Sequence, residues 1–376
     1  MAVLSDAQRE AGWTIVKLGD IATLVMGTSP KSSDVVDYPL GIPLLNGPAE
    51  FTDKYPAPVK WTEKGIRFSE PGDILFCVRA TLGKMNFSDQ KYAIGRGLAA
   101  IRGVDELHTR YIYYTLLSTM ESILRNANGT IYLSVTKSDV ENFEIPLPPE
   151  DALERIAGIL GSLDDKIEAN TRLIQTLSDY CVALVDSLKL FEGSRESTLG
   201  EIISFSPKVK KPAGEEYQFI DMSSLPTMGP VPETISSKSS WNGAKFENGD
   251  TLFARITPCL ENGKTAIAMG LGDEPACGST EFIVMRANTP EQVILPYGIA
   301  RCDKFRQEAM SHMIGSTGRQ RVKWQDLANI PVSAPSKSDM QKIEKSADIF
   351  GYFEALRKEN LQLAETRDAL IKRLIG

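Results

Sequence analysis

The second half of this chain repeats the first half, and this repeat limits the possible folds more than any other feature. The sequence KLGDI at 17–21 returns as TLGEI at 198–202, and PGDILF at 71–76 returns as NGDTLF at 248–253. The two pairs are offset by 181 and 177 residues, a difference that loop insertions explain. Two units of about 180 residues are too few for a solenoid, which needs three or more repeats. We therefore expect two similar lobes.

Each repeat ends in a proline-rich break that is followed by a long helical pattern. From Leu153 to Leu188 apolar residues recur in alternating steps of three and four without a proline, and 353–374 repeats this spacing. Such a narrow heptad seam is typical of helices that pair, and a buried asparagine in it fixes the register. We expect the two helices to pair with each other; the alternative is that each belongs to a local bundle. The residues predicted to pair them are Leu160, Leu163, Ile167, Asn170, Ile174, Leu177, Leu184, Phe353, Leu356, Asn360, Leu363 and Leu370.

The segments outside the two helices predict mixed α/β (α+β) lobes. Short β-rich runs such as 73–78 and 282–285 are bounded by glycine, proline and aspartate. Asp73 and Asp250 each follow a glycine before such a run, which favours a turn into a core strand over a catalytic role. The predicted domains are a first lobe, a first helix, a second lobe and a second helix, at 13–149, 150–192, 196–335 and 336–376.

Recognisable catalytic motifs are missing from the sequence. It has no GxxxxGK[ST] phosphate loop, GxGxxG fingerprint, HExxH motif or GxSxG motif. The two histidines and five isolated cysteines support neither histidine catalysis nor a disulfide framework or zinc knuckle. We expect no catalytic residue, no cofactor and no metal. The sequence also lacks an 18-residue apolar run and a signal-peptide pattern, so a cytoplasmic protein without membrane contact is expected.

Charge is distributed unevenly along the chain. The net charge of −7 argues weakly against non-specific binding to nucleic acid, but residues 150–195 alone carry −4. By contrast, 79–102 and 301–323 each carry +4 and interleave amide and aromatic groups. Lysine and arginine neutralise phosphates, and the forked donors of arginine and asparagine read base edges. These basic segments therefore point to DNA binding, with scattered surface charge as the alternative.

Together these features resemble the specificity subunit of a type I restriction–modification system over residues 13–376. The resemblance rests on the order lobe, helix, lobe, helix and on the lobe opening WxxxKLGDI at 13–21. The most specific strings are GDTLFARITP at 249–258, ENGK at 261–264 and GSTEF at 278–282, with the lobe exits IPLPP at 145–149 and IPV at 330–332.

This resemblance implies that each lobe is a target-recognition domain for one half of a split site in double-stranded DNA. It implies that the two helices pair antiparallel as a coiled-coil spacer with pseudo-twofold symmetry and dock two methyltransferase subunits. Methylation and cleavage then belong to the methyltransferase and restriction/translocase subunits, and this chain is not an enzyme. The first lobe has CVRATLGK at 77–84 where the second lobe has the longer string that contains RITP at 255–258, and this difference suggests two different half-sites. The acidic first helix, with Glu154, Asp164 and Asp165, is predicted to face the methyltransferases.

The candidate DNA contacts are cationic or amide residues within or near the basic segments. Arg319 and Arg321 follow the flexible stretch GSTG at 315–318, whereas Arg255 and Lys264 suit a structural role equally well. Two alternatives remain: a subunit of a type IIG-like or orphan methylation or phage-defence system, and a two-lobed scaffold that binds no DNA. The full set of candidates is Arg79, Lys84, Arg96, Asn126, Asn128, Lys137, Lys208, Lys210, Arg255, Lys264, Arg319, Arg321 and Lys323.

Overall fold

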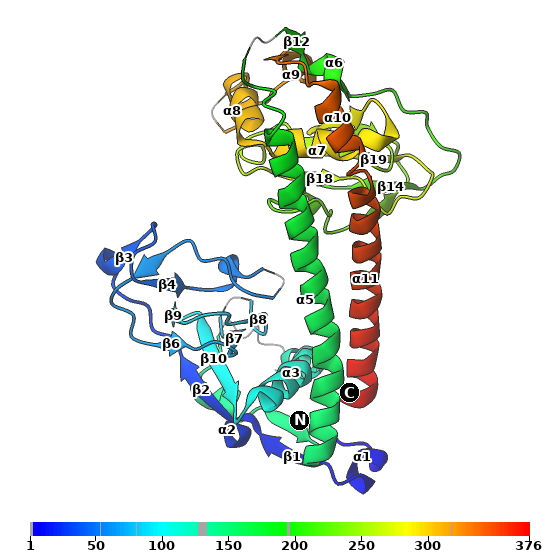
Figure 1. The fold of residues 1–376 in the computed structure, drawn as a ribbon. Coiled ribbons are helices and arrows are strands. Elements are labelled where there is room, and N and C mark those ends of the chain that lie inside the picture. Colours follow the sequence, from blue (N-terminus) through cyan, green and yellow to red (C-terminus); the bar gives the residue numbers. More distant parts are fainter. Residues whose placement is uncertain (1–2, 53, 80, 127–133, 194–195, 317) are drawn as a thin grey trace. The chain divides into compact units, whose positions relative to one another are not determined.

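A computed structural model describes residues 3–52, 54–79, 81–126, 134–193, 196–316 and 318–376, with the backbone alone for 121–126 (Figure 1). The chain divides into two compact units. Unit 1 comprises Met1–Asp165 and Leu363–Gly376, and unit 2 comprises Lys166–Gln362. Each unit therefore contains one sequence repeat together with part of each long helix, α5 (Glu150–Asp186) and α11 (Asp348–Leu374).

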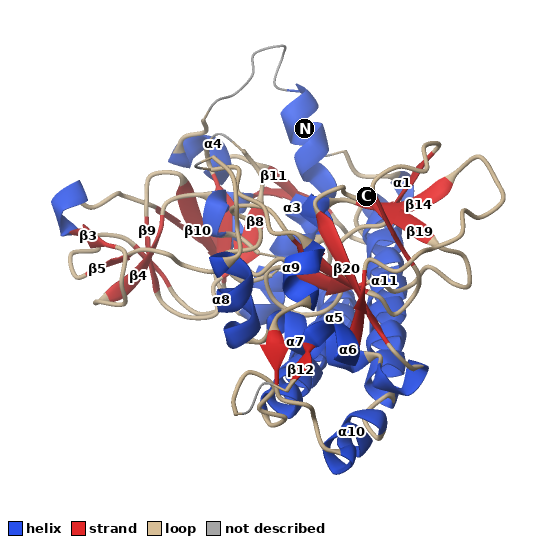
Figure 2. Ribbon diagram, turned by 90° about the horizontal axis from the view of Figure 1, so that it is seen from above, coloured by secondary structure: helices blue, strands red, loops and turns tan. Residues whose placement is uncertain are grey.

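Unit 1 combines short strands with a few helices, as Figure 2 shows by colour. Besides the start of α5 and the end of α11, its elements are α1 (Asp6–Glu10), β1 (Thr14–Lys17), α2 (Leu18–Ile21), β2 (Ala22–Met26), β3 (Val35–Val36), β4 (Ile42–Leu45), β5 (Trp61–Thr62), β6 (Phe68–Ser69), β7 (Ile74–Cys77), β8 (Met85–Phe87), β9 (Tyr92–Ile94), β10 (Leu98–Gly103), α3 (Glu106–Asn126), α4 (Lys137–Glu141) and β11 (Glu144–Leu147).

Unit 2 has a similar succession of elements. They are β12 (Ser197–Thr198), α6 (Leu199–Ile202), β13 (Ile203–Phe205), β14 (Tyr217–Ile220), β15 (Ser236–Lys238), β16 (Ala244–Phe246), β17 (Thr251–Ala254), β18 (Thr265–Ile267), β19 (Ala276–Gly278), β20 (Phe282–Ala287), α7 (Ile294–Arg301), α8 (Asp303–Ser311), α9 (Trp324–Ala328), β21 (Pro331–Val332) and α10 (Lys337–Glu344), with the remainder of α5 and α11.

The strand orders of the two units correspond. The antiparallel sheet β2-β10-β7-β8 in unit 1 matches β13-β20-β17-β18 in unit 2, and the pair β1-β11 matches β12-β21. A further sheet, β3-β5-β4-β9-β6 or β15-β14-β19-β16, contains one parallel pair in each unit. The predicted mixed α/β class is confirmed, and the sequence repeat is also a repeat of strand order.

The Gly-Asp turns before β7 and β17 are built alike. Asp73 and Asp250 are buried, and each accepts a hydrogen bond from the backbone N–H three residues earlier, at 2.8 and 2.7 Å. Each carboxylate also pairs with a forked guanidinium on the neighbouring strand, Arg102 or Arg286, at 2.5–2.8 Å. These aspartates therefore lock a turn onto a core strand, in line with the predicted structural role.

Each part of the two long helices buries one stripe in the hydrophobic core of the unit that contains it. In unit 1, Leu153, Ile156 and Leu160 of α5 share a core with Ile371 near the end of α11. In unit 2, Ile174 and Cys181 of α5 share a core with Ile343, Phe353 and Leu356, while Leu177 and Leu184 pack at its edge. The other residues predicted to pair the helices, Leu163, Ile167, Asn360, Leu363 and Leu370, are half-buried.

The helix boundaries differ from the prediction at two places. Helix α5 ends at Asp186 rather than near 192, because Leu188 and Lys189 close tight turns and Lys189 has a φ of 51°. The single helix predicted for 336–376 is two helices, α10 and α11. Between them the N–H groups of 346 and 347 bond to carbonyls three residues earlier rather than four, which ends α10 where the hydrophobic register shifts.

Candidate nucleic-acid interface

Three segments of unit 2 meet at the end of β17. The N–H of Arg255 donates to the carbonyl oxygen of Glu281 at 3.0 Å, and the N–H of Val322 donates to the carbonyl oxygen of Arg255 at 3.0 Å. Residue 321 also forms isolated bridges with Ile256 and Ile314. The backbone thus places the predicted residues Arg255 and Arg321 at one junction, together with Glu281, which was not predicted.

The guanidinium of Arg321 forms a fork with the carboxylate of Glu281. Its Nε lies 3.0 and 2.9 Å from the two carboxylate oxygens, and its Nη2 lies 2.9 Å from Oε1. Hydrogen bonding to Glu281 raises the pKa of Arg321, so the guanidinium stays charged. The side chain of Arg321 is 43% exposed, and its neighbours Arg319 and Lys323 are exposed too. Arg321 is therefore oriented by the protein while part of its surface remains accessible.

Arg255 and Lys264 differ in how their polar atoms are satisfied. The Nζ of Lys264 donates to the carbonyl oxygen of Met222 at 3.1 Å, so this half-buried lysine fixes a loop. The Nε of Arg255 is buried and has no hydrogen-bond partner among the described residues. Buried polar atoms are nearly always paired, so this unpaired donor sets Arg255 apart from Lys264.

Unit 1 builds the same junction with different side chains. The N–H of Val78 donates to the carbonyl oxygen of Gly97 at 2.9 Å, and the N–H of Val135 donates to that of Val78 at 2.9 Å. Val78 thus stands where unit 2 has Arg255, and Gly97 stands where it has Glu281. The bridge of Arg79 with Ser134 corresponds to that of Ile256 with Arg321. The two units share this backbone arrangement but carry different side chains on it.

The remaining candidates of unit 1 occupy several places. Arg79 is exposed after β7, Lys84 is exposed before β8, and Arg96 is exposed in the turn between β9 and β10. The side chain of Asn126 and the whole of Asn128 lie outside the described residues. Lys137 begins α4 and pairs with Glu141 of the same helix at 3.2 Å.

Two carboxylates of the acidic helix α5 are engaged inside unit 1. Asp164 pairs with Arg367 at 2.8 Å and accepts a hydrogen bond from Tyr114 at 2.6 Å, and Asp165 pairs with Arg110 at 2.9 Å. Glu154 is exposed. The prediction that Asp164 faces a partner protein therefore conflicts with its contacts, because this half-buried side chain holds the α5–α11 contact.

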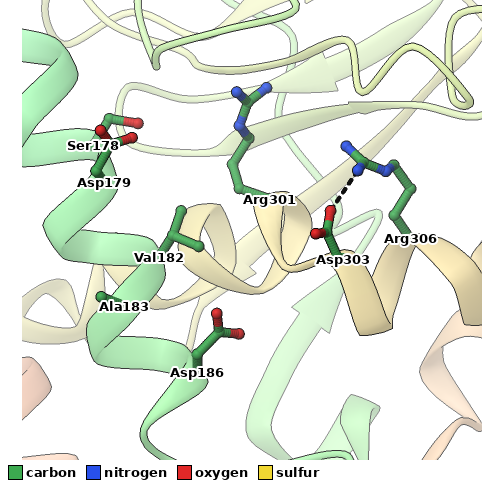
Figure 3. Close-up of a pocket in the computed structure, with 8 residues that line it drawn as sticks. All are labelled: Ser178, Asp179, Val182, Ala183, Asp186, Arg301, Asp303 and Arg306. Atoms are coloured by element: carbon green, nitrogen blue, oxygen red, sulfur yellow. Dashed lines mark hydrogen bonds and ion pairs between the residues drawn. The ribbon is translucent and has the colours of Figure 1, made fainter.

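A polar pocket of about 350 Å³ lies between α5 and helices α7 and α8 of unit 2 (Figure 3). Its charged groups are largely engaged, since Arg306 pairs with Asp303 and Arg301 donates to the carbonyl oxygens of Thr227 and Gly263. The hydroxyl of Ser178 is paired with that of Tyr297 at 2.7 Å. Its lining residues are Ser178, Asp179, Val182, Ala183, Asp186, Arg301, Asp303 and Arg306.

The described residues hold neither a metal-binding cluster nor a membrane-spanning helix. No group of three or more histidine, cysteine, aspartate or glutamate side chains in this part of the chain is placed to hold a metal ion. Of the helices in the same described ranges, none combines the length and the apolar character that a membrane span requires.

Residues 10–179 match the family described as type I restriction modification DNA specificity domain. Over this segment the resemblance predicted from the sequence is confirmed.

Individual relatives carry corresponding names. A protein described as the MjaX type I restriction enzyme specificity subunit of Methanocaldococcus jannaschii is 38% identical over 159 residues, which cover 42% of this chain and 37% of that protein. The EcoEI type I restriction enzyme specificity subunit of Escherichia coli is 27% identical over 299 residues, which cover 73% of this chain and 49% of the relative. The chain thus spans less than half the length of these two relatives.

One solved structure covers nearly the whole chain. The type I restriction–modification system S subunit from M. genitalium has a TM-score of 0.56 and 18% identity, and the match covers 97% of this chain and 96% of that one. At this identity the likeness concerns the fold alone.

Proposed function

We propose that this chain is the non-catalytic specificity subunit of a type I restriction–modification complex. Each unit reads one half of a bipartite site in double-stranded DNA, through target-recognition regions at 13–149 and 196–335. Two methyltransferase subunits dock on the chain, and restriction/translocase subunits complete the assembly. The family match over 10–179 and the named relatives support this assignment.

The repeated junction carries the proposal. Both units keep the same pair of backbone hydrogen bonds at this point, but Val78 and Gly97 in one replace Arg255 and Glu281 in the other. A scaffold needed only for support has no reason to place two charged residues at this junction in one unit and a buried valine and a glycine in the other. Two readers of different base sequences require that kind of exchange.

The chemistry of unit 2 suits base recognition. A guanidinium fork bonds to O6 and N7 of guanine in the major groove, and a good pair of this kind contributes about 1–3 kcal/mol of discrimination. Glu281 orients the exposed guanidinium of Arg321, so Arg321 is assigned to a base edge, and the half-buried Arg255 at the same junction is assigned to the same half-site. Lys264 is assigned to support of its loop. The exposed cations are assigned to base edges or phosphates; they are Arg79, Lys84, Arg96, Lys137, Lys208, Lys210, Arg319 and Lys323.

The two long helices form the spacer of the proposed complex. Helix α5 has 37 residues, so at about 1.5 Å per residue it is roughly 56 Å long, or about 16 base pairs of duplex. Pairing of α5 and α11 as an antiparallel coiled coil would set the gap between the half-sites by helix length. The exposed acidic residues of α5, Glu154 among them, are the proposed docking face for the methyltransferases.

Base-resolved methylation of the host genome, with and without this gene, tests the proposal. We expect N6-methyladenine to disappear at one split motif in the deletion strain and to return on complementation. Complementation with Arg255→Lys should restore methylation while relaxing one half of the motif. A methylome that the deletion leaves unchanged, in cells that express the protein, would contradict the proposal and favour the scaffold alternative.

A further inference from the structure

One face of the β15-β14-β19-β16 sheet in unit 2 carries a small cluster of buried side chains, Tyr217, Phe219 and Cys277, with Trp241 packed against it. Phe219 of β14 lies opposite Cys277 of β19, and Cys277 lies opposite Lys245 of β16, so their side chains share a face. Tyr217, two residues before Phe219, joins this face, and Trp241 packs against Tyr217 with ring centroids 5.1 Å apart. The other face, with Ile220 and Phe246, belongs to the hydrophobic core.

Three lysines lie over these rings. The Nζ of Lys238 is 3.3 Å from the centroid of Phe219, that of Lys211 is 5.1 Å from Tyr217, and that of Lys245 is 5.2 Å from Trp241. The aliphatic stems cover the apolar rings, while the ring faces hold the ammonium groups in place. Lys211 and Lys238 are exposed, whereas Lys245 is half-buried and its Nζ also donates to the carbonyl oxygen of Gly243 at 2.6 Å. We call these six residues the lysine–aromatic layer: Lys211, Lys238, Lys245, Tyr217, Phe219 and Trp241.

The fold itself does not demand such a layer. In the corresponding sheet of unit 1, the same row of partners is Leu44, Ala93 and Phe68. One lysine, Lys91, lies over Phe68 there at 4.9 Å, and a carboxylate at 3.0 Å, that of Glu70, pairs with it. Unit 2 instead has three lysines over the aromatic rings of this face, Lys211, Lys238 and Lys245.

The surroundings of the layer extend its positive charge and add hydroxyl donors. Lys208 and Lys210 are exposed on the segment that leads into β14, next to Lys211. The segment 236–242 reads SSKSSWN, and its four serines are exposed. The nearby carboxylates are Glu215 and Glu216, the latter bonded to Ser237 at 3.0 Å. The segments 208–217 and 236–245 together hold five lysines and two carboxylates.

This composition favours a phosphate backbone over a protein partner. Lysine, serine and amide side chains are among the groups by which proteins contact DNA phosphates. Lysine and serine are depleted at protein–protein interfaces. From this charge complementarity we propose that the lysine–aromatic layer binds the phosphate backbone of duplex DNA beside the half-site read by unit 2. The inference rests on the proposed function and adds a sequence-independent contact to it.

The salt dependence of binding tests the layer. Anisotropy of a labelled 40-base-pair duplex of random sequence would be titrated with the full chain between about 50 and 200 mM salt, for the wild type and for K211Q/K238Q/K245Q. Each phosphate contact contributes about 0.9 to the slope of log affinity against log salt, so the variant should lose up to about 2.7 from it. K211R/K238R/K245R, which keeps the charges, should retain the wild-type slope.

Matched controls separate the layer from general charge effects. K337Q/K345Q/K358Q removes three exposed lysines of unit 2 that lie on or beside α10 and α11, and it should leave the slope unchanged. An unchanged slope in K211Q/K238Q/K245Q, with wild-type circular dichroism and melting, would overturn the inference. If that variant also lost a co-purifying methyltransferase, the surface would belong to an acidic protein instead. Absence of duplex binding by the wild-type chain would contradict the proposed function itself.

Discussion

The side chain of Asn170 on α5, which is buried in unit 2, donates a hydrogen bond to that of the half-buried Asn360 on α11 at 2.9 Å. Asn170 also donates to Glu359 at 2.8 Å and accepts from Lys166 at 3.0 Å. A polar residue that is 2% exposed is tolerated only because each of its groups is satisfied. The two asparagines therefore allow one register of the helices and penalise others.

Replacing Asn170 by alanine should destabilise unit 2 by about 1–3 kcal/mol, because the amide of Asn360 and the carboxylate of Glu359 lose a buried partner. Urea unfolding followed by circular dichroism measures the change. Thr176→Ala, an exposed site on the same helix, should stay within about 0.5 kcal/mol. A double Asn170→Leu/Asn360→Leu variant should recover much of the loss; equal losses in single and double variants would contradict the register argument.

Releasing Arg321 should relax one half of the recognition site and leave the other unchanged. In Glu281→Gln the amide accepts through one oxygen only, so the guanidinium loses its fork and part of its orientation. The expected loss of discrimination is about 1–3 kcal/mol at one or two bases of the methylated motif. Genome methylation in strains that carry the variant reports this directly. Arg172→Lys on α5 serves as the control, and relaxation of both half-sites would argue against the assignment.

The two buried aspartate–arginine pairs should differ in their contribution to stability. Arg286 is 26% exposed and also contacts Glu247 at 2.8 Å, whereas Arg102 is 47% exposed. Asp250→Ala is therefore expected to lower the free energy of unfolding by about 3 kcal/mol, and Asp73→Ala by less, since solvent screens the more exposed guanidinium. Chemical denaturation of each variant gives both values. A larger loss for Asp73→Ala would reverse this ordering.

Thiol reactivity should single out one cysteine in the native protein. Burial raises the pKa of Cys77 and Cys302 to about 11 and that of Cys181 to about 12, so these thiols remain protonated and unreactive at pH 8. Cys277 is buried with a raised pKa as well, whereas Cys259 is half-buried. Mass spectrometry after iodoacetamide treatment at pH 8 should show one adduct, and none in Cys259→Ser. Two or more adducts on the folded protein would show that the core opens.

The helices and the repeat were predictable because each depends on a pattern of residues that are close together in the sequence. The seam containing Asn170 and Asn360 follows from apolar residues three and four apart, and the repeat follows from matched strings. The break between α10 and α11 was missed because a three-residue tight turn leaves the composition of the stretch unchanged.

The charged junction was predictable only in part. Arg321 stood out in a basic segment, but its partner Glu281 lies 40 residues earlier and joins it only where strands converge. The string GSTEF contains this glutamate, yet nothing in local spacing indicates its partner. The lysine–aromatic layer was missed for the same reason, since Lys211, Lys238 and Lys245 come together only across a folded sheet.

Unit 2 is continuous in sequence, whereas unit 1 is closed by the last residues of the chain. In sequence, unit 2 is thus inserted between the two segments of unit 1. Its hydrophobic core includes four residues outside 196–335, namely Ile174, Cys181, Phe353 and Leu356. Recombination that exchanges 166–362 would transfer an intact hydrophobic core, while an exchange of 196–335 cuts through it. If each unit reads one half-site as proposed, the module inherited with a new half-specificity is the longer segment, carried with its own portions of both helices.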